Sequence, residues 1–280
     1  MKNILENIVA YKKEEIRKRK SESPARLLEK QPFFSREIYS MSAFISDPAR
    51  TGIIAEFKKK SPSKGDINPD ANVETVTSAY TRYGASMISV LTDGPSFGGS
   101  TEDLVRARFN EIPILRKEFI LDPYQLVESR AMGADAVLLI AACLTATDTR
   151  RLATVARELN LEVLLEIHDE AELGHICDEV DVVGINNRDL KSFSVDIDRS
   201  IRLAEKLPVQ KIRIAESGIR DPETIIKLKA AGFNGFLIGE QFMRSPDPSI
   251  AFASFIDQLK SNLNESESLR NDATRSDKEA

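Results

Sequence analysis

Short apolar runs recur along most of the chain, and each gives way to a polar stretch with a different pattern. The runs are rich in β-branched residues and too short for buried helices, which is typical of strands covered on both faces. Eight strands are predicted: GIIAEF near residue 53, MISVLT near 88, IPILRKEF near 114, AVLLIAA near 138, LEVLLEIH near 164, VVGINNR near 184, KIRIAESG near 213 and GFLIGE near 237.

The stretches between the runs carry helical patterns with clear ends. In DPYQLVESRAMGA, Asp122 is placed to cap the first turn, Pro123 takes the first helical position and Gly133 follows the last. DPETIIKLKAAGF repeats this arrangement with Asp221 and Gly232, and STEDLVRARF and TATDTRRLATVAREL also begin with capping residues. These patterns predict helices that alternate with the strands.

Strands that alternate with helices pair in parallel through right-handed crossovers. Eight units favour a closed (β/α)8 TIM barrel over an open doubly wound sheet, and no GxGxxG motif follows the first run. We therefore expect an α/β protein in three parts. These are an N-terminal helical extension over residues 1–50, the barrel over 51–260 and a polar, disordered tail over 261–280.

Charge and composition narrow the class of protein. A net charge of −5 disfavours a nucleic-acid binder. The basic KKKSPSK segment directly follows an apolar run, which disfavours its alternative interpretation as a localisation signal or a phosphate-backbone contact. No apolar stretch is long enough to span a membrane and the N-terminus lacks a signal-peptide pattern, so we expect a cytoplasmic protein without membrane contact.

The chain has few residues that bind metals. Cys143 and Cys177 have no ligand spacing and are expected to be buried free thiols in a reducing compartment. His168 and His175 have neither an HxH nor an HExxH arrangement, which disfavours a catalytic zinc site. We therefore expect no metal.

Polar residues stand late in several apolar runs. Residues two apart in a strand share a face, so Glu56 and Lys58 lie on the side of Ile54. If these faces point inward, polar side chains of five strands meet at the carboxyl end of the barrel, the usual place of a TIM-barrel active site. The set is Glu56, Lys58, Lys117, Glu166, Asn186, Arg188 and Glu216. The alternative is that each charge meets solvent at a strand end. Arg116 and Glu118 have the opposite parity and are expected to face the helices or solvent.

Such a cluster is suited to acid–base chemistry. A lysine has a pKa near ~10.4 in water, and burial or a second ammonium lowers that pKa. The pKa of a carboxylate in an apolar mouth rises from about 4.3. Lys58 with Lys117, opposite Glu166, is therefore predicted to supply a matched acid and base.

Two late loops predict an anion site. AESGI and IGEQF place Ser217, Gly218 and Gly239 after the last two strands, which is the recurrent phosphate position of this fold. Glycines let backbone N–H groups approach an anion, and a helix N-terminus adds a favourable dipole. Ser61, in the loop after the first strand, is placed to donate a further hydrogen bond.

Several of these segments together resemble one family. IIAEFKKKSPSKGDI, PILRKEFILDPYQ, ADAVLLIAACL, LLEIHDEAEL, GINNRDLKSFSVD, IAESGI and GFLIGEQFM are similar, in this order, to the blocks of indole-3-glycerol-phosphate synthases of tryptophan biosynthesis. The N-terminal extension also looks like that of the family. The resemblance implies a carboxy-lyase that closes 1-(2-carboxyphenylamino)-1-deoxyribulose 5-phosphate to indole-3-glycerol phosphate. CO2 and water are lost, and neither a metal nor an organic cofactor is needed.

The resemblance also implies roles for single residues. The general acid falls on Lys117 and the general base on Glu166, while Lys58 matches the lysine that binds the anthranilate carboxylate. Which lysine is the acid in each step stays open. The other matched positions are Glu56, Asn186 and Glu216 for the ribulose hydroxyls and proton movement, Arg188 for the network and the phosphate end, Ser61, Gly218 and Gly239 for the phosphate, and Phe97, Phe119, Leu138 and Leu190 for the aromatic ring.

One residue departs from the family pattern. Glu240 follows Gly239, where the family often has a small residue such as serine. A carboxylate beside a phosphate repels it, so we expect this side chain to turn outward and leave only its backbone N–H at the site.

Two rival interpretations are disfavoured by the residues present. A phosphoribosylanthranilate isomerase would have a cysteine base at the end of the first strand, where this chain has Glu56 and Lys58. A non-catalytic, ligand-binding barrel would have lost a catalytic lysine or glutamate, yet every matching position is filled. The expected partner is a phosphorylated small molecule, and the chain is expected to be a monomer, with a weak dimer as the alternative.

Overall fold

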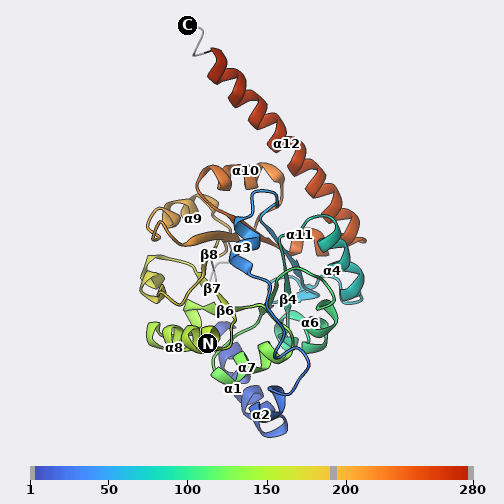
Figure 1. The fold of residues 1–280 in the computed structure, drawn as a ribbon, viewed down its shortest axis with the longest axis vertical. Coiled ribbons are helices and arrows are strands. Elements are labelled where there is room, and N and C mark those ends of the chain that lie inside the picture. The colour runs from blue at the N-terminus through green and yellow to red at the C-terminus, as the bar shows by residue number, and fades with distance from the viewer. Residues whose placement is uncertain (1–3, 190–193, 277–280) are drawn as a thin grey trace.

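The computed structural model describes residues 4–189 and 194–276, with side chains described as far as Glu265. At its centre is a closed barrel of parallel strands in the order β1-β10-β9-β8-β7-β6-β5-β4 (Figure 1). The strands are β1 (Ile53–Phe57), β4 (Met87–Leu91), β5 (Ile114–Lys117), β6 (Ala136–Ile140), β7 (Glu162–Ile167), β8 (Val182–Asn186), β9 (Ile212–Glu216) and β10 (Gly235–Ile238). One strand lies in each predicted run, so the predicted (β/α)8 barrel is confirmed.

Helices surround the barrel and follow most of its strands. They are α4 (Val73–Arg82), α6 (Thr101–Ala107), α7 (Pro123–Ala131), α8 (Ala146–Glu158), α9 (Ile197–Ala204), α10 (Pro222–Ala230) and α12 (Pro248–Ser276). The predicted caps are confirmed: the Asp122 side chain accepts from the backbone of Tyr124 in a capping box, and that of Asp221 accepts from the backbone of Thr224. Gly133 follows α7 with a φ of 89°, a conformation that favours glycine.

Short elements occupy several loops at the carboxyl end of the barrel. The loop after β1 forms a small hairpin, and short helices follow β4, β6, β7 and β10. These elements are β2 (Lys60–Ser61), β3 (Gly65–Asp66), α5 (Gly94–Phe97), η1 (Ala141–Cys143), η2 (Glu170–His175) and α11 (Glu240–Met243). Between β7 and β8 the 3-10 helix η2 stands in place of an α-helix, because the connection is short and contains Gly174.

Two apolar layers show which face of each strand points inward. The interior of the barrel contains Ile54, Leu115, Leu164 and Ile214 in one cluster. The opposite faces of the strands pack against the helices in a second cluster, which includes Phe57. Residues two apart from the interior set therefore also point inward, as the period of a strand requires.

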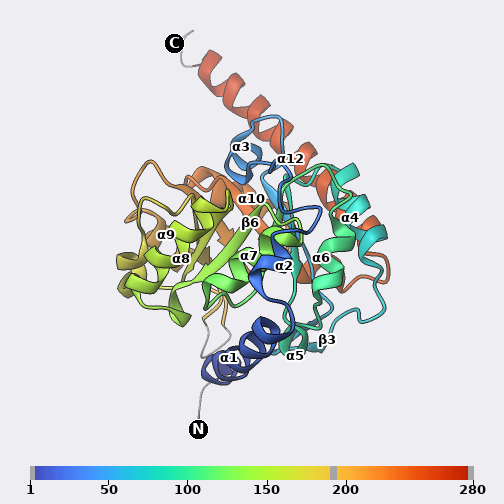
Figure 2. The ribbon, with the colours of Figure 1, turned by 60° about the horizontal axis from the view of Figure 1, so that its bottom comes forward.

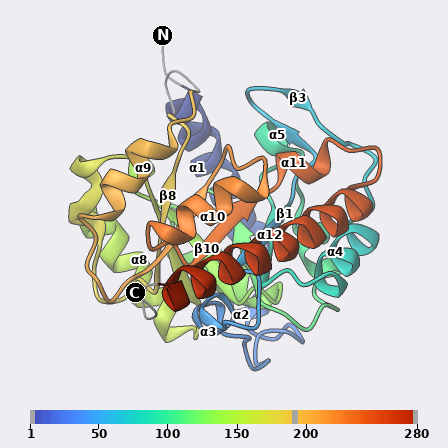
Figure 3. The same ribbon diagram turned by 90° about the horizontal axis from the view of Figure 1, so that it is seen from above.

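The N-terminal segment closes the two ends of the barrel. It contains α1 (Ile4–Glu22), α2 (Ala25–Leu28) and α3 (Met41–Ser46). Helix α1 crosses the end at which α5 and β3 lie (Figure 2), and α3 lies at the other end (Figure 3). Ile8 of α1 and Met41 and Ile45 of α3 belong to the interior apolar cluster. The extension is therefore part of the core as well as a cover over the mouth.

The last helix continues beyond the barrel. Helix α12 runs from Pro248 to Ser276 and projects past the body of the molecule (Figure 1). This differs from the disordered tail that we expected after residue 260. The reason is local: no glycine or proline follows Pro248, so nothing in the sequence ends the helix. Within the described residues, no helix combines the length and the apolar character that a bilayer crossing requires.

Candidate active site

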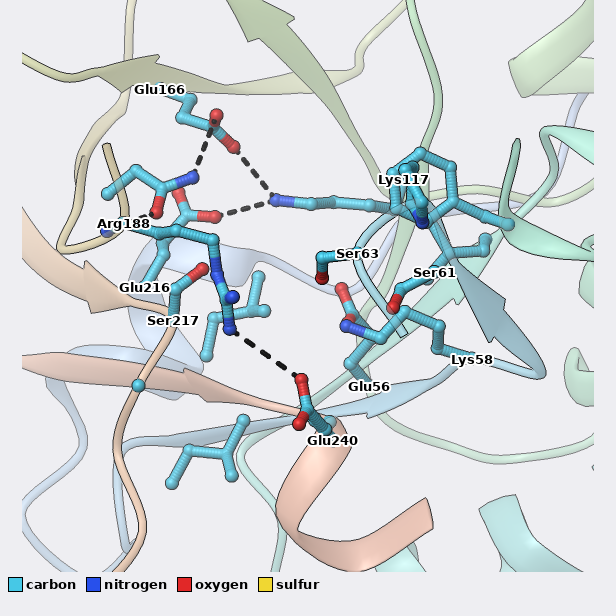
Figure 4. A pocket seen from close by; sticks show the side chains of 18 of the residues that line it. Glu56, Lys58, Ser61, Ser63, Lys117, Glu166, Arg188, Glu216, Ser217 and Glu240 are labelled. Carbon is cyan, nitrogen blue, oxygen red and sulfur yellow. Dashed lines mark hydrogen bonds and ion pairs between the residues drawn. The ribbon is translucent and has the colours of Figure 1, made fainter. Parts of the chain in front are cut away.

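A cavity of about 230 Å³ opens at the carboxyl end of the barrel. All seven inward polar residues predicted from strand parity line this cavity, namely Glu56, Lys58, Lys117, Glu166, Asn186, Arg188 and Glu216. They come from β1, β5, β7, β8 and β9 and the positions directly after these strands (Figure 4). The alternative, in which each charge meets solvent separately, does not describe this structure.

Lys117 lies at the centre of the charged cluster. Its Nζ atom donates to Oε2 of Glu216 at 2.6 Å and to Oε2 of Glu166 at 3.1 Å (Figure 4). The Asn186 amide donates to the other oxygen of Glu166 at 3.1 Å. Carboxylates of two strands, β7 and β9, thus converge on one ammonium group from β5, and Asn186 of β8 supports one of them.

Glycine makes room for one of these carboxylates. A Cβ atom at position 184 would lie 2.1 Å from Oε1 of Glu216, so only glycine fits on the neighbouring strand. That oxygen is buried and has no hydrogen-bond partner among the described residues. Gly184 therefore keeps a polar acceptor free inside the mouth.

The protonation states differ from those we expected for Lys117 and Glu166. Burial alone would lower the pKa of Lys117, but the charges of Glu216, Glu166 and Glu56 raise it above its usual range. Burial alone would raise the pKa of Glu166, but Lys117, His168 and Asn186 hold it well below its usual range. The prediction of a lowered lysine pKa and a raised Glu166 pKa is wrong, because ion pairing outweighs desolvation here.

Glu216 is the carboxylate with a raised pKa. Burial raises the pKa of Glu216 to about 7, against the charge of Lys117, and the negative charges of Glu166 and Glu56 contribute. Two carboxylates that share one ammonium cannot both be fully compensated. The cluster therefore has an ionised Glu166 and a Glu216 that exchanges a proton near neutral pH.

A second ion pair lies across the mouth. Lys58 Nζ is 2.8 Å from Oε1 of Glu56, so the pair at the end of β1 is an intrastrand contact on one face. A Cβ atom at position 239 would lie 2.7 Å from that carboxylate oxygen. Gly239 is thus needed for close packing of β10 against Glu56.

The glycine loops lie at one end of the cavity. Ser61, Ser217, Gly218 and Gly239 all line it. Ser217 and Gly218 have φ values of 69° and 73°, which bend the backbone after β9. The hydroxyl of Ser61 is buried and has no hydrogen-bond partner among the described residues. The Ser61 hydroxyl is thus a free donor at this end of the cavity, as an anion site requires.

Glu240 does not turn outward as we expected. Its Oε2 atom lies 3.6 Å from Nη2 of Arg188 (Figure 4). Its Oε1 atom lies 3.5 Å from Nη1 of Arg244. About a quarter of its side chain, 24%, is exposed, and it lines the cavity. With two guanidinium groups nearby, an inward carboxylate is compensated in the free protein, which explains the difference.

Apolar side chains form another wall. Phe97 of α5 and Phe119 after β5 have ring centroids 6.1 Å apart, and Leu138 of β6 lies in the same lining. The predicted ring contact Leu190 lies outside the described residues. A flat aromatic group fits against this wall.

The residues of opposite parity face the helices. The Arg116 guanidinium is fully buried and donates to Ser129 and Glu128 of α7. Glu118 is buried as well and lies 3.0 Å from Nζ of Lys12 on α1. The prediction that these two side chains point away from the barrel interior is confirmed for Arg116. Glu118 points to α1 and also borders the cavity.

Sequence reasoning missed three groups at this site. Ile4, Leu5 and Ile8 of α1 line the cavity, but the pattern of α1 does not show what it covers. Arg244 lines the cavity from the end of α11. Strand parity placed His168 on the face of Glu166, but the predicted polar set and the site residues did not include it.

The remaining candidates for metal or redox chemistry are few. Among the side chains that the structure describes, no three His, Cys, Asp or Glu residues gather in a way that would hold a metal ion. Cys177 is buried and Cys143 is half-buried, and both are free thiols.

Fold and cavity together define the class: a (β/α)8 barrel protein with an acid–base site at the carboxyl ends of its strands. The family model for indole-3-glycerol phosphate synthase matches residues 5–255. An indole-3-glycerol phosphate synthase from Bacteroides thetaiotaomicron is 44% identical over 261 residues, which cover 93% of this chain and 100% of the relative. One from Salinibacter ruber is 43% identical over 255 residues, 90% of this chain and 94% of the relative.

This chain belongs to the indole-3-glycerol phosphate synthase family, and it is an enzyme of tryptophan biosynthesis, a carboxy-lyase. Solved structures agree on the fold. The 3-hexulose-6-phosphate synthase from Salmonella typhimurium superposes with a TM-score of 0.60 at 12% identity, over 75% of this chain and 99% of that chain. A mutant tryptophan synthase alpha-subunit from Pyrococcus furiosus superposes with a TM-score of 0.57 at 14% identity, over 75% of this chain and 98% of that chain. At these identities the likeness concerns the barrel alone.

Proposed function

We propose that the cavity binds 1-(2-carboxyphenylamino)-1-deoxyribulose 5-phosphate and closes it to indole-3-glycerol phosphate, with Lys117 and Glu166 as the principal acid and base. The observation that carries the proposal is the position of Lys117 between Glu166 and Glu216, in a cavity that an apolar wall and the glycine loops also line. The substrate has three matching parts: an aromatic ring, a ketone with hydroxyls, and a phosphate.

Ring closure is the first step. The ring carbon that bears the carboxylate attacks the ketone carbon, and Lys117 gives a proton to the ketone oxygen as the bond forms. The raised pKa of Lys117 means that the proton is present at neutral pH. Lys58 binds the carboxylate until it leaves as CO2. Holding the two carbons together against Phe119 and Leu138 is worth several kcal/mol, of order ~7 when the alignment is good.

Dehydration completes the indole. An acid, for which Lys58 is the nearest remaining ammonium, protonates the new hydroxyl so that it leaves as water. Glu166 then takes the proton from the carbon next to nitrogen. The substrate gains two protons, one on the ketone oxygen and one on the hydroxyl, and loses one to Glu166. The net gain of one proton balances the negative charge of the carboxylate, which departs as neutral CO2. Glu166 can act as a base because its low pKa keeps it ionised.

Neighbouring polar groups support these steps. Asn186, Glu56 and Glu216 lie within reach of the hydroxyls of a sugar chain in the cavity. Glu216 also contacts Lys117 directly, and with a pKa of about 7 it is suited to return a proton to the amine after each cycle. Arg188 and the glycine loops bind the phosphate.

Turnover can be followed by indole fluorescence with the purified protein and the carboxyphenylamino substrate. Lys117→Ala and Glu166→Gln should each lower kcat by about 10²–10⁴-fold, the usual contribution of a general acid or base. Both variants should keep the circular dichroism spectrum of the fold. Lys227→Ala, which removes an exposed ammonium paired with Asp198, serves as the control. Absence of product with the unchanged protein would refute the reaction, and wild-type kcat in both variants would refute the roles.

A further inference from the structure

His168 is a buried ionisable residue that the steps above leave without a role. It follows β7, two residues after Glu166, and only 9% of its side chain is exposed. Its Nε2 atom lies 3.3 Å from Oε1 of Glu166 and its Nδ1 atom 3.4 Å from Oε2 of Glu172. The imidazole is thus placed between the proposed base and a second carboxylate.

Glu172 holds this arrangement from the other side. It lies on η2, the 3-10 helix that stands between β7 and β8. Its carboxylate also accepts the backbone N–H of His168 at 2.6 Å.

Several elements bring other charged and titratable groups close to Glu166, His168 and Glu172. Lys117 of β5 and Glu216 of β9 lie on the cavity side of Glu166. Cys143 of η1 lies near Glu166 and Glu172. Burial raises the pKa of its thiol to about 12, so the thiol stays neutral. Burial alone would lower the pKa of His168, but Glu166 and Glu172 raise it to about 10. In this setting an imidazolium is the expected form at neutral pH.

The reaction changes the charge beside Glu166. In the free enzyme Glu166 contacts two cations, Lys117 and His168. When Lys117 turns to the ketone and gives up its proton, it no longer stabilises the carboxylate. His168 is then the remaining positive charge next to the base.

We infer that His168 is a positioning residue that remains an imidazolium between Glu172 and Glu166 and keeps Glu166 ionised until it accepts the last proton. The inference depends on the proposed role of Glu166 as the base. His168 itself transfers no proton: Glu172 retains its charge and holds the imidazolium in place when Glu166 becomes neutral.

Substitution of His168 by glutamine separates charge from shape. The glutamine amide would keep an N–H donor near the position of Nε2 but would carry no charge. The acid limb of the kcat profile reports ionisations in the bound complex, where Lys117 is engaged with substrate. Loss of one cation next to a carboxylate raises the carboxylate pKa by about one unit or more. In His168→Gln the acid limb should therefore move to higher pH by about one unit, with kcat up to about tenfold lower along that limb and unchanged on the plateau above it.

A second variant and a matched control make the test specific. Glu172→Gln keeps the cation beside Glu166 and removes only the anion behind it, so its acid limb should not move to higher pH. His175→Gln changes the chain's other histidine, which bonds Thr149 outside the cavity, and should leave the profile unchanged. An equal loss of kcat at every pH in His168→Gln would show a merely structural role and overturn the inference.

The charge of His168 can also be measured without turnover. The chain has two histidines, so NMR of the imidazole carbons gives two signals, and His175→Gln assigns them. The His168 signal should show the protonated form at pH 7 and begin to titrate only well above pH 8. A neutral His168 at pH 7 would overturn the inference. Because this measurement needs no substrate, its result is independent of whether the proposed reaction takes place.

Discussion

Glu240 lies beside Arg188 and Arg244, at the end of the cavity that we propose binds the phosphate. In the free protein the carboxylate compensates both guanidinium groups, which would otherwise repel one another. A bound phosphate needs the same donors, so it competes with Glu240 for them. The residue that follows Gly239 therefore influences how much affinity the arginines contribute to substrate binding.

Replacement of Glu240 by serine should strengthen phosphate binding. The variant removes a like charge and adds a small donor, so KM should fall about threefold to tenfold. The inhibition constant of inorganic phosphate should fall in parallel. Glu240→Asp keeps the charge and should resemble the unchanged enzyme in both constants. A KM that rises in Glu240→Ser would show that the carboxylate assists binding.

Helix α1 is fastened to the barrel through one buried lysine. Nζ of Lys12 lies 2.7 Å from Glu15, 2.9 Å from Asp93 and 3.0 Å from Glu118. Burial alone would lower the pKa of Lys12, but Glu118 and Asp93 raise it. Tyr11 adds a hydrogen bond of 2.7 Å to Asp93. The element that covers the active site is thus held by charge as well as by its apolar face.

Lys12→Ala should destabilise the protein and weaken substrate binding together. The change leaves Asp93 buried without its cation and Glu118 with only Arg116, at 3.8 Å, which costs about 3–5 kcal/mol. Displacement of α1 also removes its apolar side chains from the cavity wall, so KM should rise. Urea unfolding and KM measurements test both effects, with the exposed neighbour Lys13→Ala as the control. Equal results for the two variants would contradict the role of Lys12.

At the scale of the whole molecule, the active site costs stability. Glu216 has a pKa of about 7 in the folded protein against a usual value of 4.5. The folded state therefore binds more protons than the unfolded state between these values. The contribution of Glu216 to the stability of the folded protein is therefore fully present below about pH 4.5. It is lost as the pH rises through about 7.

Glu216→Gln should remove this pH dependence. Glutamine imitates the protonated acid. The free energy of unfolding of the variant, relative to that of the unchanged protein, should therefore increase between pH 5 and pH 8 by as much as about 3 kcal/mol. The difference in Tm should increase with it. Thermal unfolding at the two pH values measures it. Glu170→Gln, an exposed carboxylate, should show no such trend. A difference that shrinks towards pH 8 would contradict the assignment of the raised pKa to Glu216.

Some properties of the whole molecule stay predictions. They are the division at residues 50 and 260, the monomeric state, the cytoplasmic location and the lack of a nucleic-acid partner. Light scattering on the purified protein tests the monomer directly. The α12 segment beyond residue 260, which projects from the barrel, is the first place to look for a dimer contact (Figure 1).

Sequence alone was enough for the barrel, its helix caps and the inward set of polar residues. These features depend on local spacing: a period of two decides which side chains share a face of a strand, and capping is decided within one helical turn. Glu56, Lys117 and Glu216 were found in this way. His168 followed the same rule and could have been included.

Only the tertiary structure decided how these groups affect one another. The pKa of Lys117 rises although burial alone would lower it, because Glu216 and Glu166 arrive from other strands. Glu240 turns inward because Arg188 lies across the cavity. Coulomb energy depends on distance in space, which spacing along the chain does not give. Local order was therefore readable from the sequence, whereas charge states and the cover formed by α1 required the folded arrangement.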